Sequence, residues 1–244
     1  MNTARVLSIV VGVVVVLIII EGVRLLRHIA ISKRITKDIT KFERQRPAAR
    51  TRLLFVGDST GYGTGTSHAR FSLVGRLGAD YPDAHIENVS RNGSLLIGVR
   101  DTLRDIAETS TTAPYDTVIL MAGGMDMLYG TPRWLVRRLL QSALTYGKRC
   151  GRAVVLVGPN NAGRAPLYRF PLSNLYQGRA RQFDALYREA AQQANVHFVS
   201  LYGERTDPLV ERNLFATDKT HPNDEGYGIW YDQMKGVISS TLPS

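Results

Sequence analysis

The stretch Arg52–Ser59, RLLFVGDS, decides the fold class of this chain. Its apolar residues predict a short buried strand, which ends at Gly57. Far along the chain, Asp218 and His221 stand three positions apart in a polar loop before the last helical pattern. A serine hydroxyl becomes an effective nucleophile when a histidine takes its proton and a carboxylate orients that histidine. Ser59, His221 and Asp218 are therefore the candidate members of a hydrolytic triad.

Beyond this strand, short apolar runs alternate with longer helical patterns. The strand candidates are residues 53–56, 84–89, 117–121, 153–157 and 196–200, and the helical stretches are 71–80, 95–108, 132–147, 174–194 and 225–240. Strands that alternate with helices are joined by crossover connections, which give a parallel sheet covered on both faces. The expected fold class is therefore α/β with a five-stranded parallel sheet.

Polar or glycine-rich residues follow four of these strands. They are Ser59 after the first, Asn92 and Gly93 after the second, residues 123–126 after the third, and Asn160 and Asn161 after the fourth. The carboxyl ends of parallel strands meet at one edge of a sheet, where ligands bind. These residues therefore predict a single site at that edge.

The N-terminal region predicts a membrane anchor. Val6–Ile20 is apolar and uncharged but covers only about 22 Å as a helix. The hydrocarbon core is about 30 Å thick, so the expected span runs on to residue 26. A cleaved signal peptide is the weaker alternative, because no A-x-A-like cleavage site follows. The predicted order is a tail (1–5), a transmembrane anchor (6–26), a basic helical stalk (27–51) ended near Arg46–Pro47, and a domain (52–244).

The positive charge is concentrated in the stalk. Residues 21–52 hold ten Lys or Arg against three acidic residues, a net of +7 of the formal +10, and residues 53–244 hold only +2. A nearly neutral domain argues against nucleic acid as a partner. The basic flank predicts a single-pass protein of the bacterial inner membrane with a cytoplasmic domain, and an extracytoplasmic domain is the alternative.

No cofactor or metal is expected. The single Cys150 cannot form an internal disulfide, and no Cys or His cluster has zinc-ligand spacing. The run Gly57–Gly65 matches neither G-x-G-x-x-G nor the P-loop, so it does not indicate nucleotide binding. His68, the rival base near Ser59, has no obvious orienting acid.

The motif Gly57-x-Ser59-x-Gly61 matches the nucleophile elbow of the α/β-hydrolase fold, but that elbow normally follows several strands. Three blocks in order instead resemble the GDSL, or SGNH, hydrolase superfamily. They are Gly57-Asp58-Ser59, Asn88-Val89-Ser90-Arg91-Asn92-Gly93 and Asp218-x-x-His221-Pro222. The resemblance covers residues 52–240 and implies a three-layer α/β/α sandwich of the flavodoxin-like kind.

The resemblance also implies roles for single residues. Ser59 would be the nucleophile, His221 the general base and then acid, and Asp218 the residue that orients His221. The backbone amides of Ser59 and Gly93 would form the oxyanion hole. The family's third block is G-x-N-D, whose Asn donates to the oxyanion, whereas this chain has Met125 at that position. Asn92, Asn160 and Asn161 are candidate substitute donors.

The expected function is a membrane-anchored serine esterase or lipase that hydrolyses carboxylic esters through an acyl-enzyme. An anchored enzyme would meet its substrate near the bilayer, as a lipid ester or an acylated glycan. One alternative is an acyltransferase or deacetylase that acts on envelope glycans with the same triad. The other, motivated by Met125, is a weakly active or inactive binding module.

Overall fold

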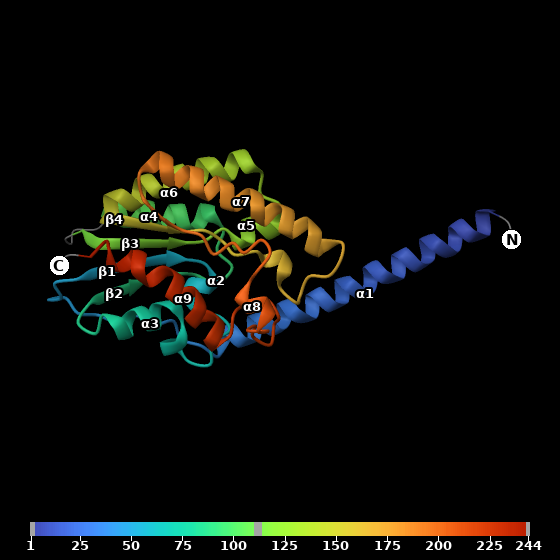
Figure 1. The fold of residues 1–244 in the computed structure, drawn as a ribbon, viewed down its shortest axis with the longest axis horizontal. Coiled ribbons are helices and arrows are strands. Elements are labelled where there is room, and N and C mark those ends of the chain that lie inside the picture. Colours follow the sequence, from blue (N-terminus) through green and yellow to red (C-terminus); the bar gives the residue numbers. More distant parts are fainter. Residues whose placement is uncertain (1–2, 110–113, 243–244) are drawn as a thin grey trace.

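The computed structural model describes residues 3–109 and 114–242, and its centre is a five-stranded parallel sheet with helices on both faces (Figure 1). The strands are β1 (Arg52–Gly57), β2 (His85–Asn88), β3 (Tyr115–Met121), β4 (Gly151–Val157) and β5 (His197–Val199). Their order across the sheet is β2-β1-β3-β4-β5, and every neighbouring pair is parallel. All five predicted strands are confirmed, together with the α/β class.

Alternate residues of the central strands supply two separate apolar cores. Leu54 and Val56 of β1 face the core beneath α4 (Leu96–Thr109), α6 (Arg133–Cys150) and α7 (Leu172–Ala194). Leu53 and Phe55 face the opposite core, covered by α3 (Leu73–Asp80) and α9 (Asp224–Ser239). Successive side chains of a strand point to opposite faces, so a strand buried on both sides is apolar throughout. This pattern made the strands recognisable.

Short helices at the ends of the strands were not predicted. They are α2 (Ser59–Tyr62), α5 (Gly124–Tyr129) and α8 (Pro208–Glu211), with 3₁₀ turns at Ala69–Phe71 and Ala162–Arg164. Of these, α2 and α5 directly follow β1 and β3 at the carboxyl edge of the sheet. Both therefore help to position the residues at that edge.

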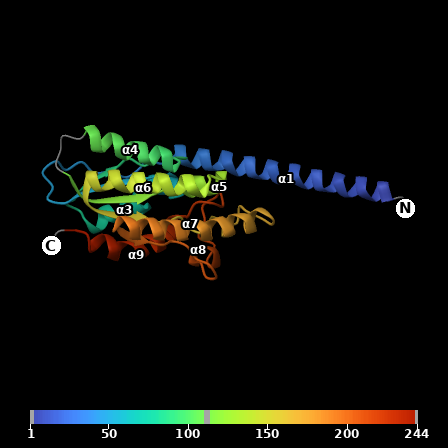
Figure 2. The same cartoon turned by 90° about the horizontal axis from the view of Figure 1, so that it is seen from above.

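The N-terminal helix α1 (Thr3–Lys37) projects away from the sheet and helices (Figures 1 and 2). The expectation that this helix continues to Arg46–Pro47 was wrong, because it ends at Lys37. The segment after Lys37 pairs with the sheet instead. Arg44 and Ile86 exchange two backbone hydrogen bonds of 2.8 and 2.9 Å at the free edge of β2. These bonds replace those that a continued helix would have made.

Over the described parts of the chain, no helix was found that is both long and apolar enough to cross a membrane. The anchor expected over residues 6–26 is therefore not supported. Residues 1–2 of the expected N-terminal tail lie outside the described residues.

Candidate active site

The turn that carries Ser59 is fixed by its neighbours. Asp58 caps α2, and its carboxylate oxygen Oδ1 accepts hydrogen bonds from the Thr60 backbone N–H (3.0 Å) and hydroxyl (2.7 Å). A Cβ at Gly61 would lie 2.4 Å from the Ser90 hydroxyl oxygen and 2.7 Å from the Phe55 ring. Only glycine allows this close approach of α2 to the end of the sheet. Ser59 consequently has one defined position, with 8% of its surface exposed.

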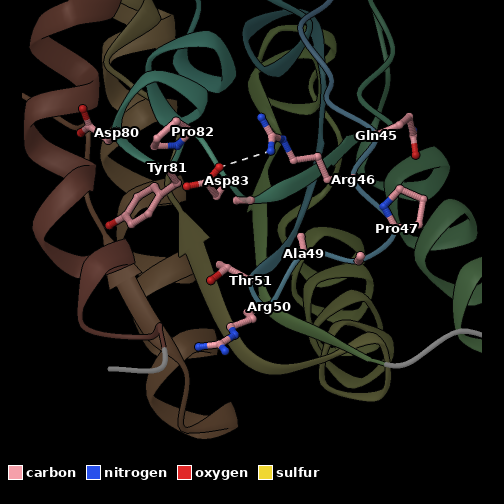
Figure 3. A pocket seen from close by; sticks show the side chains of 12 residues that line it. Gln45, Arg46, Pro47, Ala49, Arg50, Thr51, Asp80, Tyr81, Pro82 and Asp83 are labelled. Carbon is pink, nitrogen blue, oxygen red and sulfur yellow. Dashed lines mark hydrogen bonds and ion pairs between the residues drawn. The ribbon is translucent and has the colours of Figure 1, made fainter.

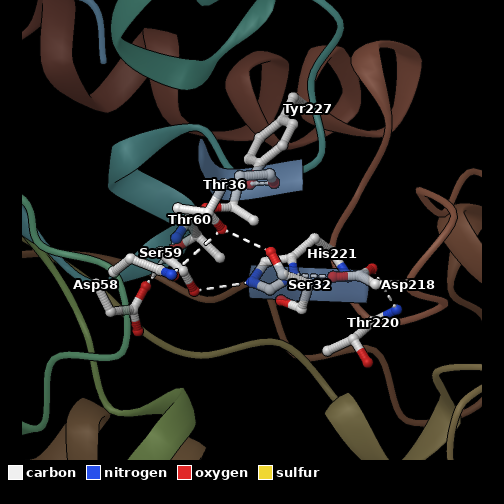
Figure 4. A network of polar contacts seen from close by, with 11 residues as sticks. Ser32, Thr36, Asp58, Ser59, Thr60, Asp218, Thr220, His221 and Tyr227 are labelled. Carbon is white, nitrogen blue, oxygen red and sulfur yellow. Dashed lines mark hydrogen bonds and ion pairs between the residues drawn. The ribbon is translucent and has the colours of Figure 1, made fainter. Parts of the chain in front are cut away.

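Ser59, His221 and Asp218 form a continuous chain of hydrogen bonds (Figure 4). The Ser59 hydroxyl oxygen lies 2.8 Å from Nε2 of His221, and Nδ1 of His221 lies 2.6 Å from Oδ2 of Asp218. The second oxygen of Asp218 accepts the backbone N–H groups of Thr220 and His221, each at 3.0 Å. With a proton on Nδ1, Nε2 is left to accept the serine proton.

The two buried carboxyl groups near Ser59 have opposite pKa shifts. Burial opposes the ionisation of Asp218, but the hydrogen bond and positive charge of His221 outweigh it, so the pKa of Asp218 lies below its ordinary value. Burial raises the pKa of Asp58, against hydrogen bonds from Thr60 and the charge of His221. The environment therefore favours the carboxylate form of Asp218, which can stabilise an imidazolium.

The loop after β2 presents Gly93 at the same edge. Gly93 has a φ of 74°, in the left-handed region that glycine adopts most readily, and a Cβ there would meet no atom within 4 Å. The Arg91 N–H donates to the Gly57 carbonyl (3.1 Å), which attaches this loop to the end of β1. This bond joins the residue two positions before Gly93 to the residue two positions before Ser59.

Buried Asp126 connects the loops that follow β2 and β3. Its carboxylate accepts the Leu96 N–H at 2.7 Å and the Thr131 hydroxyl at 3.0 Å. A Cβ at Gly124 would lie 3.6 Å from Oδ2 of Asp58, so the start of α5 packs against the nucleophile turn. Met125 lies between Gly124 and Asp126 in α5, at the position where the sequence resemblance implies an Asn that donates to the oxyanion. Its thioether has no N–H, so it cannot donate a hydrogen bond.

The three candidate substitute donors differ in their contacts. The buried Asn161 amide donates one of its two N–H groups to the Gly203 carbonyl at 3.0 Å, in the loop after β5. The Asn92 amide donates one N–H to the Thr36 hydroxyl at 3.2 Å, which leaves its second N–H. Within the described ranges, the side chain of Asn160 makes no hydrogen bond. Asn92 is the candidate that the structure connects to the site.

Two other residues considered from the sequence have structural roles. Nδ1 of exposed His68 accepts the Arg70 N–H at 3.2 Å and so caps a 3₁₀ turn. The thiol of buried Cys150 donates to the Leu103 carbonyl at 3.4 Å, and burial raises its pKa to about 11. In the part of the chain that the structure describes, no group of three or more His, Cys, Asp or Glu could hold a metal ion.

Sequence reasoning missed the contribution of α1. Ser32 and Thr36, in the last turns of this helix, belong to the same network of polar contacts as Ser59 and His221 (Figure 4). The one available signal was a pair of small polar residues four positions apart, within a helix whose other residues are largely apolar or basic.

A separate cavity lies away from the triad. A cavity of about 730 Å³ is lined by residues 45–51 and 80–84, which precede β1 and β2 (Figure 3). It therefore lies at the amino edge of the sheet, opposite Ser59. A smaller cavity of about 440 Å³ is lined by Ile35 of α1, Gly65–Ser67, Phe215–Thr217 and Asn223–Glu225, beside the loop that carries Asp218.

Comparison with known proteins matches residues 55–229 to the GDSL-like Lipase/Acylhydrolase family. A search of curated protein sequences found no match. Among solved structures, a lipolytic G-D-S-L family protein from Veillonella parvula DSM 2008 has a TM-score of 0.62 at 19% identity, covering 78% of this chain and 98% of its own. The esterase EstA from a Pseudoalteromonas species, in a structure inhibited by monoethylphosphonate, gives 0.59 at 19%, covering 78% and 97%. A lipase/acylhydrolase from Enterococcus faecalis gives 0.60 at 20%, covering 79% and 97%.

Proposed function

The chain belongs to the GDSL-like lipase/acylhydrolase family and is a hydrolase of ester bonds, and from that premise we propose that it acts through an acyl-enzyme on Ser59. The observation that carries the proposal is the unbroken chain of hydrogen bonds from Ser59 through His221 to Asp218, at 2.8 and 2.6 Å. Both distances allow proton transfer or charge stabilisation without rearrangement.

Acylation begins when Nε2 of His221 takes the proton of the Ser59 hydroxyl as the serine oxygen bonds to the ester carbonyl carbon. The carbonyl oxygen becomes an oxyanion, which the backbone N–H groups of Ser59 and Gly93 stabilise. Collapse of this intermediate breaks the bond to the alcohol, which leaves with the proton from His221. Asp218 offsets the positive charge on His221 throughout.

Deacylation repeats these steps with water as the nucleophile. His221 takes a proton from water, and the water oxygen bonds to the acyl carbon. The bond to Ser59 breaks, the acid is released, and His221 returns its proton to the serine oxygen. If a sugar hydroxyl replaced water, the same site would act as an acyltransferase.

Met125 favours one alternative, a slow enzyme or a binding module. Loss of one oxyanion donor typically costs on the order of 100- to 1,000-fold in rate. The site keeps its nucleophile, base and acid, so the missing donor predicts slow turnover more directly than it predicts none.

Attachment to a bilayer is a second, separate proposal. It is supported by the apolar sequence 6–20 and by large apolar side chains of α1 that are exposed: Leu7, Ile9, Val11, Val15, Val16, Ile19, Ile20, Val23 and Leu26. Basic residues follow them, and an anionic leaflet attracts such residues. We expect a cytoplasmic domain, and therefore resistance to protease added to spheroplasts; digestion from outside would place the domain on the other side.

A panel of short and long p-nitrophenyl esters tests the catalytic proposal. Wild type should release nitrophenol, and Ser59→Ala should not. A serine-reactive phosphonate should label Ser59 in the wild type, as detected by mass spectrometry. Equal release by both proteins would contradict the acyl-enzyme, and release that requires an added sugar acceptor would assign the transferase.

A further inference from the structure

The last turns of α1 lie against the active site and contact more than one of its loops. The Thr36 hydroxyl oxygen lies 3.3 Å from the Thr64 hydroxyl and 3.2 Å from the Asn92 amide nitrogen. Thr64 follows the nucleophile turn, and Asn92 precedes Gly93. A single side chain of α1 thus bridges the two loops that supply the proposed oxyanion donors.

The connection from Thr36 to the nucleophile is short. Thr64 is fully buried, and its backbone N–H donates to the Ser59 carbonyl at 3.0 Å. Figure 4 draws Thr36, Ser32 and Ser59 in one network of polar contacts. One hydroxyl contact and one backbone hydrogen bond therefore separate Thr36 from the serine.

The loop with Gly93 has few contacts of its own. Arg91, Asn92 and Gly93 are all exposed. Within the described ranges, the bond from Asn92 to Thr36 is the one side-chain hydrogen bond formed by these three residues. Besides the backbone bond from Arg91 to Gly57, the Asn92–Thr36 bond therefore helps to fix the position of this exposed loop.

The hydrogen-bonding capacity of Thr36 fits this arrangement. Its one hydroxyl proton is donated to the Ser32 carbonyl, at 2.8 Å, within the helix. Two lone pairs are left, one for the Asn92 N–H and one for the Thr64 hydroxyl. Thr36 therefore acts as an acceptor for both loops, with every polar atom of its side chain in use.

The same helix is connected through Leu167 to the loop that carries the base. The Arg24 guanidinium donates to the Leu167 carbonyl, and the Leu167 N–H donates to the Lys219 carbonyl at 3.1 Å. Lys219 lies between Asp218 and His221. Ile35 lines the smaller cavity together with Phe215–Thr217, at the start of that loop.

We propose that α1 is part of the active site and that Thr36 is a positioning residue. Its hydroxyl holds Asn92, and through it the Gly93 N–H, in place beside Ser59. This inference rests on the proposed function, because it assumes that Gly93 donates to an oxyanion formed on attack by Ser59. With Met125 in place of the third donor, the transition state depends more on the two backbone donors, so their placement matters more.

The variants Thr36→Val and Thr36→Ser test the proposal. Valine keeps the shape of threonine without the hydroxyl, and serine keeps the hydroxyl. Loss of one neutral hydrogen bond corresponds to about 3- to 10-fold. We expect Thr36→Val to lower kcat by about that factor with little change in KM, because the oxyanion exists only in the transition state, and Thr36→Ser to retain activity.

Thr145→Val is the matched control. Thr145 is exposed on α6, and its hydroxyl donates to the Gln141 carbonyl four residues earlier at 2.8 Å, as Thr36 does to Ser32. Removing the Thr145 hydroxyl deletes an equivalent hydrogen bond within a helix far from the site, so kcat should not change. The rate of phosphonate labelling should fall with kcat in Thr36→Val and stay constant in the control.

Asn92→Ala removes the other partner on an exposed loop, so it tests the contact even if Thr36→Val folds poorly. Thr36→Val should have almost no effect on kcat in the Asn92→Ala background. Equal effects in both backgrounds, wild-type kcat in Thr36→Val, or an equal loss in Thr145→Val would overturn the proposal. Activity retained by Ser59→Ala would instead refute the proposed function.

Discussion

The sequence resemblance implies that Met125 occupies the position of the family's oxyanion Asn, so Met125→Asn should supply an amide donor there. Position 125 is fixed on both sides. The preceding Gly124 packs against the carboxylate of Asp58, and the following Asp126 accepts the Leu96 N–H at 2.7 Å. The side chain at 125 therefore starts between the loop that carries Ser59 and the loop that follows Gly93.

The size of the effect follows from what an oxyanion donor contributes. Deletion of one donor costs about 3 to 4 kcal/mol of transition-state stabilisation, or on the order of 100- to 1,000-fold in rate. A donor introduced without further adjustment should recover part of that, so we expect kcat to rise at least about 10-fold. KM should change little, because the new hydrogen bond forms only as charge develops on the ester oxygen.

Turnover of p-nitrophenyl esters by wild type, Met125→Asn and Met125→Leu measures the effect. Leucine matches methionine in size and apolarity but cannot donate, so its kcat should equal that of the wild type. An unchanged kcat in a folded Met125→Asn variant would refute the reasoning and indicate that another group already donates. A rise in both variants would assign the effect to packing.

Three further changes have defined outcomes. Asp218→Asn should lower kcat about 10⁴-fold, because the amide favours the wrong tautomer of His221. Folding lowers the pKa of Asp218 below 3.8, so its carboxylate stabilises the folded protein above that pH, and this stabilisation is lost as the pH falls through the folded-state pKa. Acid titration of the free energy of unfolding should show that loss for the wild type and not for the variant. Gly123→Ala should reduce the free energy of unfolding in urea by about 3 kcal/mol or more, because φ is 109° and the new Cβ would lie 2.0 Å from the Tyr187 hydroxyl; wild-type stability would contradict this backbone geometry. Tyr187→Phe should reduce it by about 1 to 3 kcal/mol, because the buried hydroxyl donates to the Ala122 carbonyl at 2.6 Å, and an unchanged urea midpoint would show that the bond contributes nothing net.

The centre of the sheet could be predicted because β1, β3 and β4 each contain a continuous apolar run between polar segments. The end of α1 could not be predicted, because apolar residues at helical spacing continue past Lys37, at Ile31, Ile35, Ile39 and Phe42. Pairing of Arg44 with the edge of β2 overrides that local pattern, and sequence spacing carries no information on it.

The sequence likewise predicts some residues of the candidate site and not others. Ser59, Asp218 and His221 belong to short sequence blocks, and the structure brings their side chains within hydrogen-bond distance. Their roles stay predictions until the variants are measured. Short α2 and α5 were missed because neither is long enough to show a helical period. Thr36 was missed because its partners lie in loops distant in sequence.

Because α1 is continuous from its apolar half to Thr36, its length fixes the distance between that apolar half and the active site. A helix rises about 1.5 Å per residue, so Thr36 lies about 24 Å along the axis from Ile20. If the apolar half is held in lipid, this length sets how far Ser59 stands from the surface and therefore which ester groups it reaches. One inserted residue would rotate the two halves of α1 by about 100° relative to each other. Four inserted residues would move the site about 6 Å farther from the apolar half and change its orientation much less.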